Sequence, residues 1–448
     1  MYLCNMLRKI IGTFSTRVLC FFINFGIVII TTNVFGSTGL GTISLFLVGV
    51  ALLQTLTDFA GAPSLVYMLP RFDNFQLLFL SYIFGFITNI AMCIVLYSIN
   101  LIPREFWEMV LLSSIFCSIY TINTQFFLSK EKINLYNRFV ILQMLLLVGF
   151  LLLFVFVFNQ RDVSRYIYAH VLSYCVSGIF SCLFLFKKVK FQGFQGIFSL
   201  LKKMFKYGFV IQIANLSQLL NTRLSIYIIK FTAGIKSLGL YNFGTKLSET
   251  IWLFPSSIAS VQYARIVNCE DNKEYAKKIS LVFLKLALII TLIGAIGLLL
   301  LPNAWIAYIF GNEFIEAKRV FYALGLGIIF FSCNIILSTY FSGFGKYKVN
   351  MTASLIGLAV LGICCLIGFQ HLKQTDYQNV IFAVGLMTSL SYLSSFTYAF
   401  IRFAKDTKLK FSELKIGKQD IFILKREIRK IRDAIKRYSS VKPKIDTI

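Results

Sequence analysis

The chain is poor in the residues from which most catalytic and metal sites are built. Its 448 residues include 19 Asp and Glu, two His, and ten Cys that form no Cys-x-x-Cys pair. His170 and His371 lie far apart without metal-ligand spacing, so we expect no metal site. No phosphate-binding glycine loop and no Ser/His/Asp pattern occurs. These absences predict a chain without a cofactor and without enzymatic activity of its own.

Charged residues are also scarce, at 14%, whereas hydrophobic residues make up 57% of the chain. Apolar runs recur in stretches of about 20 residues, which is enough for a helix to cross a hydrocarbon core of about 30 Å. We therefore predict an all-α integral membrane protein with twelve spanning helices. The predicted spans lie near 11–33, 39–60, 75–98, 106–128, 137–158, 165–186, 207–230, 238–262, 279–301, 318–343, 347–369 and 378–401.

The net charge of +26 has an uneven distribution over the predicted loops. An even number of spans puts both termini on one side, and that side carries 33 Lys and Arg against eight on the other. By the positive-inside rule both termini are predicted to lie in the cytoplasm. Topology accounts for most of the basic character, so we expect no nucleic acid partner.

A weak internal repeat relates the two six-span halves. Three residues after the first span recur after the seventh at a constant offset of 198: Gly36, Leu40 and Gly41 match Gly234, Leu238 and Gly239. Residues 104–108 match residues 312–316 at an offset of 208. Six spans per half give the repeats the same orientation, which predicts two pseudo-symmetric six-helix bundles around a central cavity.

The repeat suggests three regions. We predict an N-lobe with its cytoplasmic linker at 1–200, a C-lobe at 201–401 and a basic tail at 402–448. Residues 197–206 mix Phe and Leu with Lys, which favours an interfacial segment. Residues 421–438 predict a basic amphipathic helix on an anionic leaflet, with a short coiled coil as the alternative.

Four cations lie inside predicted spans and only two acids oppose them. The cations are Arg17, Arg223, Lys246 and Lys285, and the acids are Asp58 and Glu249. A charge at the bilayer centre costs roughly 2.5 to 3.5 kcal/mol on insertion scales, so such residues usually face a polar cavity. A cavity that is mostly positive indicates transport of something negative.

Polar side chains form a stripe on the first and the seventh span. In the first they fall within an arc of about 60° and in the seventh within about 160° at helical periodicity. The stripes consist of Thr13, Arg17, Cys20, Asn24 and Thr31, and of Gln212, Asn215, Gln218, Thr222, Arg223 and Ser225. Under the offset of 198 Arg17 corresponds to Asn215. We expect these stripes to line the cavity, although interhelical hydrogen bonding is the alternative.

The chain resembles a polysaccharide-unit (O-antigen) flippase of the multidrug/oligosaccharidyl-lipid/polysaccharide exporter superfamily. The resemblance covers about residues 5–402. It is carried by GTFSTRVLCFFINFGIVIITTNVFGSTGLGTISL at 12–45, SLGLYNFGTKLSETIWLFPSSIASVQYARI at 237–266 and AYIFGNEFIEAKRVFYALGLGIIF at 307–330. One departure is Ala264, where the family often has a proline that ends the eighth span.

This resemblance implies a polyprenyl-pyrophosphate-linked oligosaccharide as cargo, in a V-shaped cavity that opens to each side in turn. It places the protein in the bacterial inner membrane, with bilayer lipids, a polysaccharide polymerase and a chain-length regulator as partners. In related flippases a basic residue in the first span helps to engage the pyrophosphate, and Arg17 occupies the matching place. Arg223 and Lys246 fit the basic residues that line the cavity in relatives.

The residues suggest further roles. Four amides, Asn24, Gln212, Asn215 and Gln218, can replace the hydrogen bonds between sugar and water. Glu249 follows Lys246 by three positions and can pair with Lys246 or Arg223 in an empty cavity. Glu249 and Asp58 are the candidates for proton or sodium coupling. A structural pair with Asp58, or a side chain that reaches the headgroups, is the alternative for Arg17, and we expect Lys285 to reach the headgroups.

Two other functions compete with this interpretation. A cation-coupled drug antiporter of the same superfamily would need an acidic interior, which four cations against two acids disfavour. A membrane glycosyltransferase or polymerase would need acidic groups or a large outer loop. The longest outer loop, near 302–317, has about sixteen residues. Its Glu313 and Glu316 match Glu105 and Glu108 in the repeat, which favours a structural turn over a catalytic pair.

Overall fold

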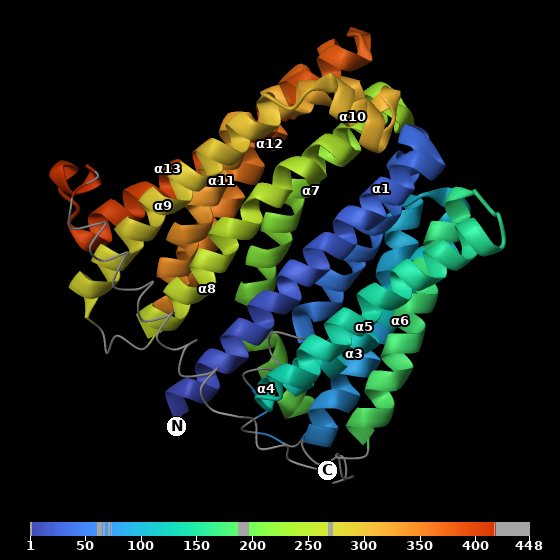
Figure 1. The fold of residues 1–448 in the computed structure, drawn as a ribbon. Coiled ribbons are helices and arrows are strands. Elements are labelled where there is room, and N and C mark those ends of the chain that lie inside the picture. The colour runs from blue at the N-terminus through green and yellow to red at the C-terminus, as the bar shows by residue number, and fades with distance from the viewer. Residues whose placement is uncertain are drawn as a thin grey trace.

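A computed structural model describes residues 2–60, 74–186, 197–267 and 272–415, together with positions 65, 68, 69, 72 and 417. Every regular element within these residues is helical (Figure 1). The long helices are α1 (Tyr2–Thr57), α3 (Asn74–Ser98), α4 (Trp107–Ser129), α5 (Ile133–Leu152), α6 (Val163–Phe186), α7 (Ile197–Glu249), α8 (Leu253–Val267), α9 (Lys273–Leu299), α11 (Lys318–Gly343), α12 (Tyr347–Gln374) and α13 (Tyr377–Thr407). The short helices that matter below are α10 (Asn303–Phe310), η1 (Asp58–Ala60), η4 (Thr250–Trp252), η5 (Asn312–Ala317) and η6 (Phe411–Leu414).

Nine segments of the described chain are long and apolar enough to cross a membrane. One of them, Ser15–Thr57, contains most of the first two predicted spans. The seventh and eighth predicted spans lie in α7 and α8, which are not among the nine and carry many of the polar residues singled out above. The predicted all-α fold with many spans is therefore confirmed.

The helices form two bundles (Figure 1). One contains α1 and α3 to α6, and the other contains α7 to α13, with α1 and α7 side by side between them. The predicted boundary at 200/201 falls inside α7, whose first turns pack on the N-terminal bundle: Leu200 and Met204 are buried in one cluster with Leu77 and Phe126. The division into lobes stays a prediction, and the predicted helix at 421–438 lies outside the described residues.

The repeated glycines mark equivalent kinks in α1 and α7. Gly36 has φ 64° and Gly234 has φ 82°, and each joins two spans without an intervening loop. Positive φ is accessible to glycine at little steric cost, which explains why glycine stands at both kinks. The offset of 198 therefore relates two equivalent backbone structures.

The second pair of repeated glycines lies where the bundles cross. A Cβ atom on Gly239 would stand 1.7 Å from the carbonyl oxygen of Ser37, and a Cβ atom on Gly41 would stand 2.2 Å from that of Ile235. Ser37 and Ile235 are themselves 198 residues apart, so the contact is reciprocal, as across a twofold axis. Leu40 is buried beside this contact, as is its repeat partner. We call this the crossing end, and the opposite end, where α1 begins, the terminal end.

Candidate functional site

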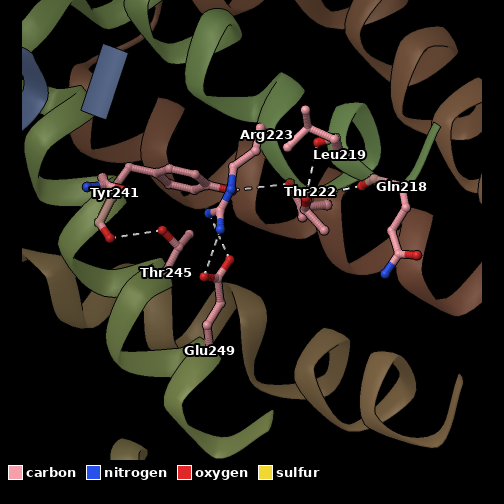
Figure 2. Close-up of polar contacts among 9 residues, drawn as sticks. Gln218, Leu219, Thr222, Arg223, Tyr241, Thr245 and Glu249 are labelled. Atoms are coloured by element: carbon pink, nitrogen blue, oxygen red, sulfur yellow. Dashed lines mark hydrogen bonds and ion pairs between the residues drawn. The ribbon is translucent and has the colours of Figure 1, made fainter. Parts of the chain in front are cut away.

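Arg223 and Glu249 form a bidentate ion pair inside the C-terminal bundle (Figure 2). Nη1 donates to Oε1 at 2.9 Å and Nη2 donates to Oε2 at 3.1 Å. The two side chains are 30% and 20% exposed. Glu249 is the last residue of α7 and carries its negative charge at the point where the chain continues through η4 into α8. Arg223 compensates this charge with the planar fork that suits carboxylates and phosphates alike.

Lys246 lies one helical turn before Glu249 and is half-buried. In the part of the chain that the structure describes, no hydrogen bond or ion pair reaches its amine. Arg223 engages both carboxylate oxygens of Glu249, so Lys246 makes no hydrogen bond to this carboxylate, although the negative charge of Glu249 still acts on its amine. The sequence left open which of the two cations pairs with Glu249, and the structure selects Arg223.

A small cavity lies behind the ion pair. It has about 10 Å³, room for about one water molecule, and its lining includes Thr245, Ser248, Glu249, Trp252 and Tyr392. Ser248 Oγ and Trp252 Nε1 are buried without a hydrogen-bond partner among the described residues. Buried polar atoms of this kind are usually satisfied by water, so the cavity extends the polar site around Glu249.

The polar stripe on α7 divides between exposed and buried side chains. Asn215 and Gln218 are exposed, whereas Gln212 is 1% exposed. Gln212 Oε1 accepts a hydrogen bond from Asn215 Nδ2 at 2.9 Å, so Gln212 orients Asn215 from inside the bundle. Thr222 donates to the backbone oxygen of Gln218 (Figure 2), and Ser225 is buried. Asn215 and Gln218 are therefore the amides available to a ligand.

The stripe on α1 also divides. Arg17 is exposed and its Nη1 donates to Ser260 Oγ of α8 at 3.2 Å, a contact between the bundles. Asn24 is exposed, but its Nδ2 donates to the backbone oxygen of Cys20 and contacts Met144 Sδ of α5 at 3.7 Å. Thr31 is buried and bonds its own helix. The side chain of Thr13 lies outside the described residues.

Asp58 ends a hydrogen-bonded chain that the sequence analysis missed. Gln54 Nε2 donates to Asp58 Oδ1 at 3.3 Å, and Ser118 Oγ of α4 lies 3.2 Å from Gln54 Oε1. Asn89 of α3 donates to Ser118 at 3.0 Å and is fully buried. An asparagine within an apolar span was the available signal, but the other members of the chain come from two other sequence regions. The chain links Asp58 to the middle of the N-terminal bundle.

Lys285 differs from the expectation that it reaches the headgroups. Its amine donates to the backbone oxygen of Lys415 at 2.8 Å. Beside it the buried Lys277 pairs with Glu413 of η6 at 2.8 Å. The hydrogen bond from Lys277, and after it one from the backbone N–H of Lys410, lower the pKa of the Glu413 carboxyl. The segment after α13 thus packs on α9 and provides the partner that lipid was expected to provide.

The acids of the outer loop hold the crossing end together. Glu313 accepts hydrogen bonds from the backbone N–H and the hydroxyl of Ser37, both at 2.7 Å. It therefore caps the second half of α1 across the bundle boundary. Glu316 accepts from the Tyr377 hydroxyl at 3.0 and 3.1 Å. Both carboxylates thus serve structural contacts, as the repeat indicated. Among the described residues no group of His, Cys, Asp and Glu could hold a metal ion.

Comparisons with known proteins agree with this architecture. A sequence profile described as polysaccharide biosynthesis protein matches residues 6–269. A Shigella flexneri protein named as an O-antigen transporter is 20% identical over 200 residues, which cover 44% of this chain and 47% of that protein. The chain thus matches about half the length of this curated relative.

Solved structures with the same fold are also known. The lipid II flippase MurJ in an inward closed conformation has a TM-score of 0.69 at 16% identity, covering 92% of this chain and 89% of that chain. An inward-facing multidrug resistance MATE family transporter of the MOP superfamily has a TM-score of 0.67 at 14% identity, covering 87% and 95%. At these identities the likeness concerns the fold.

Proposed function

Because the chain belongs to the polysaccharide biosynthesis protein family, we propose that it is a flippase for a polyprenyl-pyrophosphate-linked oligosaccharide. The chain is a membrane transporter and not an enzyme, as are its family and its structural neighbours. The cargo that we propose is a repeat unit of O-antigen or another surface polysaccharide, carried across the bacterial inner membrane. The named O-antigen transporter and lipid II flippase support this class of cargo.

The orientation follows from charge. The predicted loops at the terminal end, with the tail, carry 33 Lys and Arg against eight at the crossing end. We assign the terminal end to the cytoplasm and the crossing end to the periplasm. The crossing end is held by the glycine contact and by Glu313, so we assign the structure to the state that receives cargo from the cytoplasm. A polymerase and a chain-length regulator are the partners that we expect on the periplasmic side.

The observation that carries the proposal is the bidentate pair of Arg223 and Glu249. A guanidinium that holds a carboxylate through two parallel hydrogen bonds has the geometry in which it also holds a phosphate. Lys246 beside it adds a positive charge, and its amine has no hydrogen-bond partner within the described part of the chain. An incoming pyrophosphate can displace Glu249 from Arg223 and gain the charge of Lys246 at the same time. The site therefore favours an anionic cargo over a cationic one.

Arg17 provides the first contact. It is exposed on α1, about six residues into its predicted span from the cytoplasmic side, and Ser260 holds one guanidinium nitrogen while leaving the others to a ligand. The pyrophosphate then moves from Arg17 to Lys246 and Arg223. The exposed amides of Asn215 and Gln218 replace hydrogen bonds between sugar and water, with Asn24 closer to α5. The prenyl tail stays in the lipid, because only the polar headgroup needs shelter from hydrocarbon.

Glu249 is also the residue for which we propose a coupling role, with Asp58 as the second candidate. When cargo displaces Glu249 from Arg223, the carboxylate loses its counter-charge in the membrane. It must then bind a proton or a small cation, since an unpaired buried charge is strongly unfavourable. Cargo binding and cation uptake are thereby linked. A drug antiporter, by contrast, needs a free carboxylate for its cationic substrate, and Arg223 occupies this one.

The double substitution Arg223→Ala/Lys246→Ala tests the proposal. We expect lipid-linked units to accumulate on the cytoplasmic leaflet while their synthesis continues, because the outer cationic station is lost. A leaflet-specific accessibility assay in a flippase-null host measures this, with Lys373→Ala, a cation outside the predicted spans, as the matched control. Units that reach the periplasm as in the wild type would overturn the cationic relay.

A further inference from the structure

A groove of about 260 Å³ opens on the N-terminal bundle between α3, α4 and α6. Its lining is almost wholly apolar and includes Phe86 of α3, Ile115, Ile119 and Ile122 of α4, and Phe186 of α6. An engineered apolar cavity of about 150 Å³ holds a benzene molecule. The groove therefore has room for a stretch of hydrocarbon chain.

The groove opens toward the lipid. Phe86 and Phe186 at its rim are 53% and 54% exposed, and Ile83, Ile87 and Leu183 on the same helices are exposed as well. In a chain that spans the membrane, exposed apolar side chains of this kind face hydrocarbon. The residues proposed to contact cargo lie on α1 and α7, and neither of these helices lines the groove. The groove is thus separate from the cargo site.

Its depth matches one leaflet. Phe186 is the last residue of α6, and α4 ends at Ser129, seven residues beyond Ile122. Seven helical residues correspond to about 10 Å of rise. Both helices end at the terminal end, so the groove runs from the middle of the membrane toward the cytoplasmic leaflet. This assignment rests on the orientation given under the proposed function.

Basic residues lie near that end of the bundle, and one of them, Lys130, donates to the backbone oxygen of Leu69. Lys130 follows the last residue of α4, and Arg138 near the start of α5 is exposed. In the sequence Lys187 and Lys188 come directly after Phe186. Basic residues at the cytoplasmic ends of spanning helices attract anionic headgroups. We propose that the groove binds one acyl chain of an anionic phospholipid from the cytoplasmic leaflet.

Such a lipid would act on the bundle that holds Asp58. Asn89 and Ser118 lie in the wall of the groove and also belong to the hydrogen-bonded chain that ends on Asp58. An acyl chain in the groove fills the space between the helices that carry these residues. Occupancy therefore stabilises the arrangement of α3 and α4 on which the chain depends.

Photo-crosslinking of the purified full-length protein in nanodiscs tests this inference. The probe is phosphatidylglycerol with a diazirine in its acyl chain, and adducts are mapped by mass spectrometry. We expect adducts to concentrate at residues 115–122 and 182–186, and to fall when unlabelled phosphatidylglycerol competes but not when phosphatidylcholine does. Ile119→Trp fills the groove and should abolish these adducts. Leu112→Trp, at an exposed site on α4 outside the groove, should leave them unchanged.

Each result that contradicts the proposed lipid site has a different meaning. Adducts spread evenly over the exposed apolar side chains would mean ordinary solvation by lipid and would overturn the site. Equal competition by phosphatidylcholine would overturn the preference for an anionic lipid. Competition by a polyprenyl phosphate alone would assign the groove to the cargo's tail. If Ile119→Trp does not fold, the competition on the wild-type protein still decides. None of these outcomes depends on transport, so failure here is distinguishable from failure of the proposed function.

Discussion

The two halves of the molecule share a backbone plan but surround their cations differently. Gly36 and Gly234 form matching kinks, and Gly41 and Gly239 form matching sides of one crossing. Arg17, however, is exposed and reaches a hydroxyl of the other bundle, whereas Arg223 is held by a carboxylate of its own bundle. The repeat thus preserves the helix geometry and not the charges. Under the proposed function, a cargo that passes between the halves would meet an exposed cation in one and a neutralised cation in the other.

The largest effect is expected where the halves are alike, at the crossing. Gly239→Ala and Gly41→Ala each push a methyl group into a backbone oxygen of the other half. Each should lower the free energy of unfolding by about 3 kcal/mol, the upper part of the range for overpacking. Thermal unfolding of the purified protein measures this. Gly297→Ala, where a Cβ meets nothing within 4 Å, is the control. A Gly239→Ala protein as stable as the Gly297→Ala control would contradict the close backbone contact between the two halves.

The next effect separates the two cations. Arg223→Ala removes both hydrogen bonds to the Glu249 carboxylate and leaves only the charge of Lys246 near it. This should destabilise the protein by about 2 kcal/mol, below the range for fully buried pairs because both side chains are partly exposed. Arg223→Ala/Glu249→Ala should recover part of this loss. Arg17→Ala should change stability by no more than about 0.5 kcal/mol, since its partner is a surface hydroxyl. Equal losses of stability for Arg17→Ala and Arg223→Ala would contradict the difference proposed here between an exposed and an ion-paired arginine.

A smaller structural effect with a clear functional one is expected at Arg17 itself. Polysaccharide display in a flippase-null host should fall strongly for Arg17→Ala and less for Arg17→Lys, which keeps the charge but loses the planar fork. Ser260→Ala should reduce display least, because it removes only the hydroxyl that orients the guanidinium. Wild-type display by a well-expressed Arg17→Ala protein would contradict the role of first contact.

The smallest effect is expected at η6. Hydrogen bonds lower the pKa of Glu413 below its ordinary value of 4.5. Its contribution to docking is therefore complete above that value and is lost as the pH falls through the lowered pKa of the docked state. Proteolysis of the segment after α13 should accelerate only at such acidic pH, and Glu413→Gln should remove this dependence.

Lys285→Gln should change polysaccharide display only mildly; complete loss in a correctly inserted protein would contradict this.

The sequence predicted the helices well because membrane thickness imposes a length on apolar runs. It also predicted the glycine repeat, since backbone kinks and close crossings restrict residue type at fixed positions. It was less informative about side chains. Helical periodicity places Gln212 and Asn215 on one side of α7, but only packing shows that the first is buried and the second exposed.

Long-range partners were the least predictable part of the site. Glu249 was recognised as a partner because Lys246 is three residues away, whereas the choice of Arg223 needed the geometry of two helical segments. Lys285 bonds a residue 130 positions away, and the chain from Asn89 to Asp58 draws on three helices. Local spacing carries no information about such contacts.

The continuity of α7 has a mechanical consequence. Its first turns are buried with the N-terminal bundle, while Asn221 further along bonds Ser391 and Ser395 of α13 in the other bundle. The helix α7 is therefore anchored to both bundles and restricts how far they can move apart. We expect the gap between the bundles at the terminal end to widen only as far as α7 bends or its first turns detach. Under the proposed function, the stiffness of α7 would then limit the size of the headgroup that enters. Met204→Glu places a charge in the contact between the first turns of α7 and the N-terminal bundle. Spin-label distances between the two bundles at the terminal end should then lengthen, and unchanged distances would show that this contact does not restrict their separation.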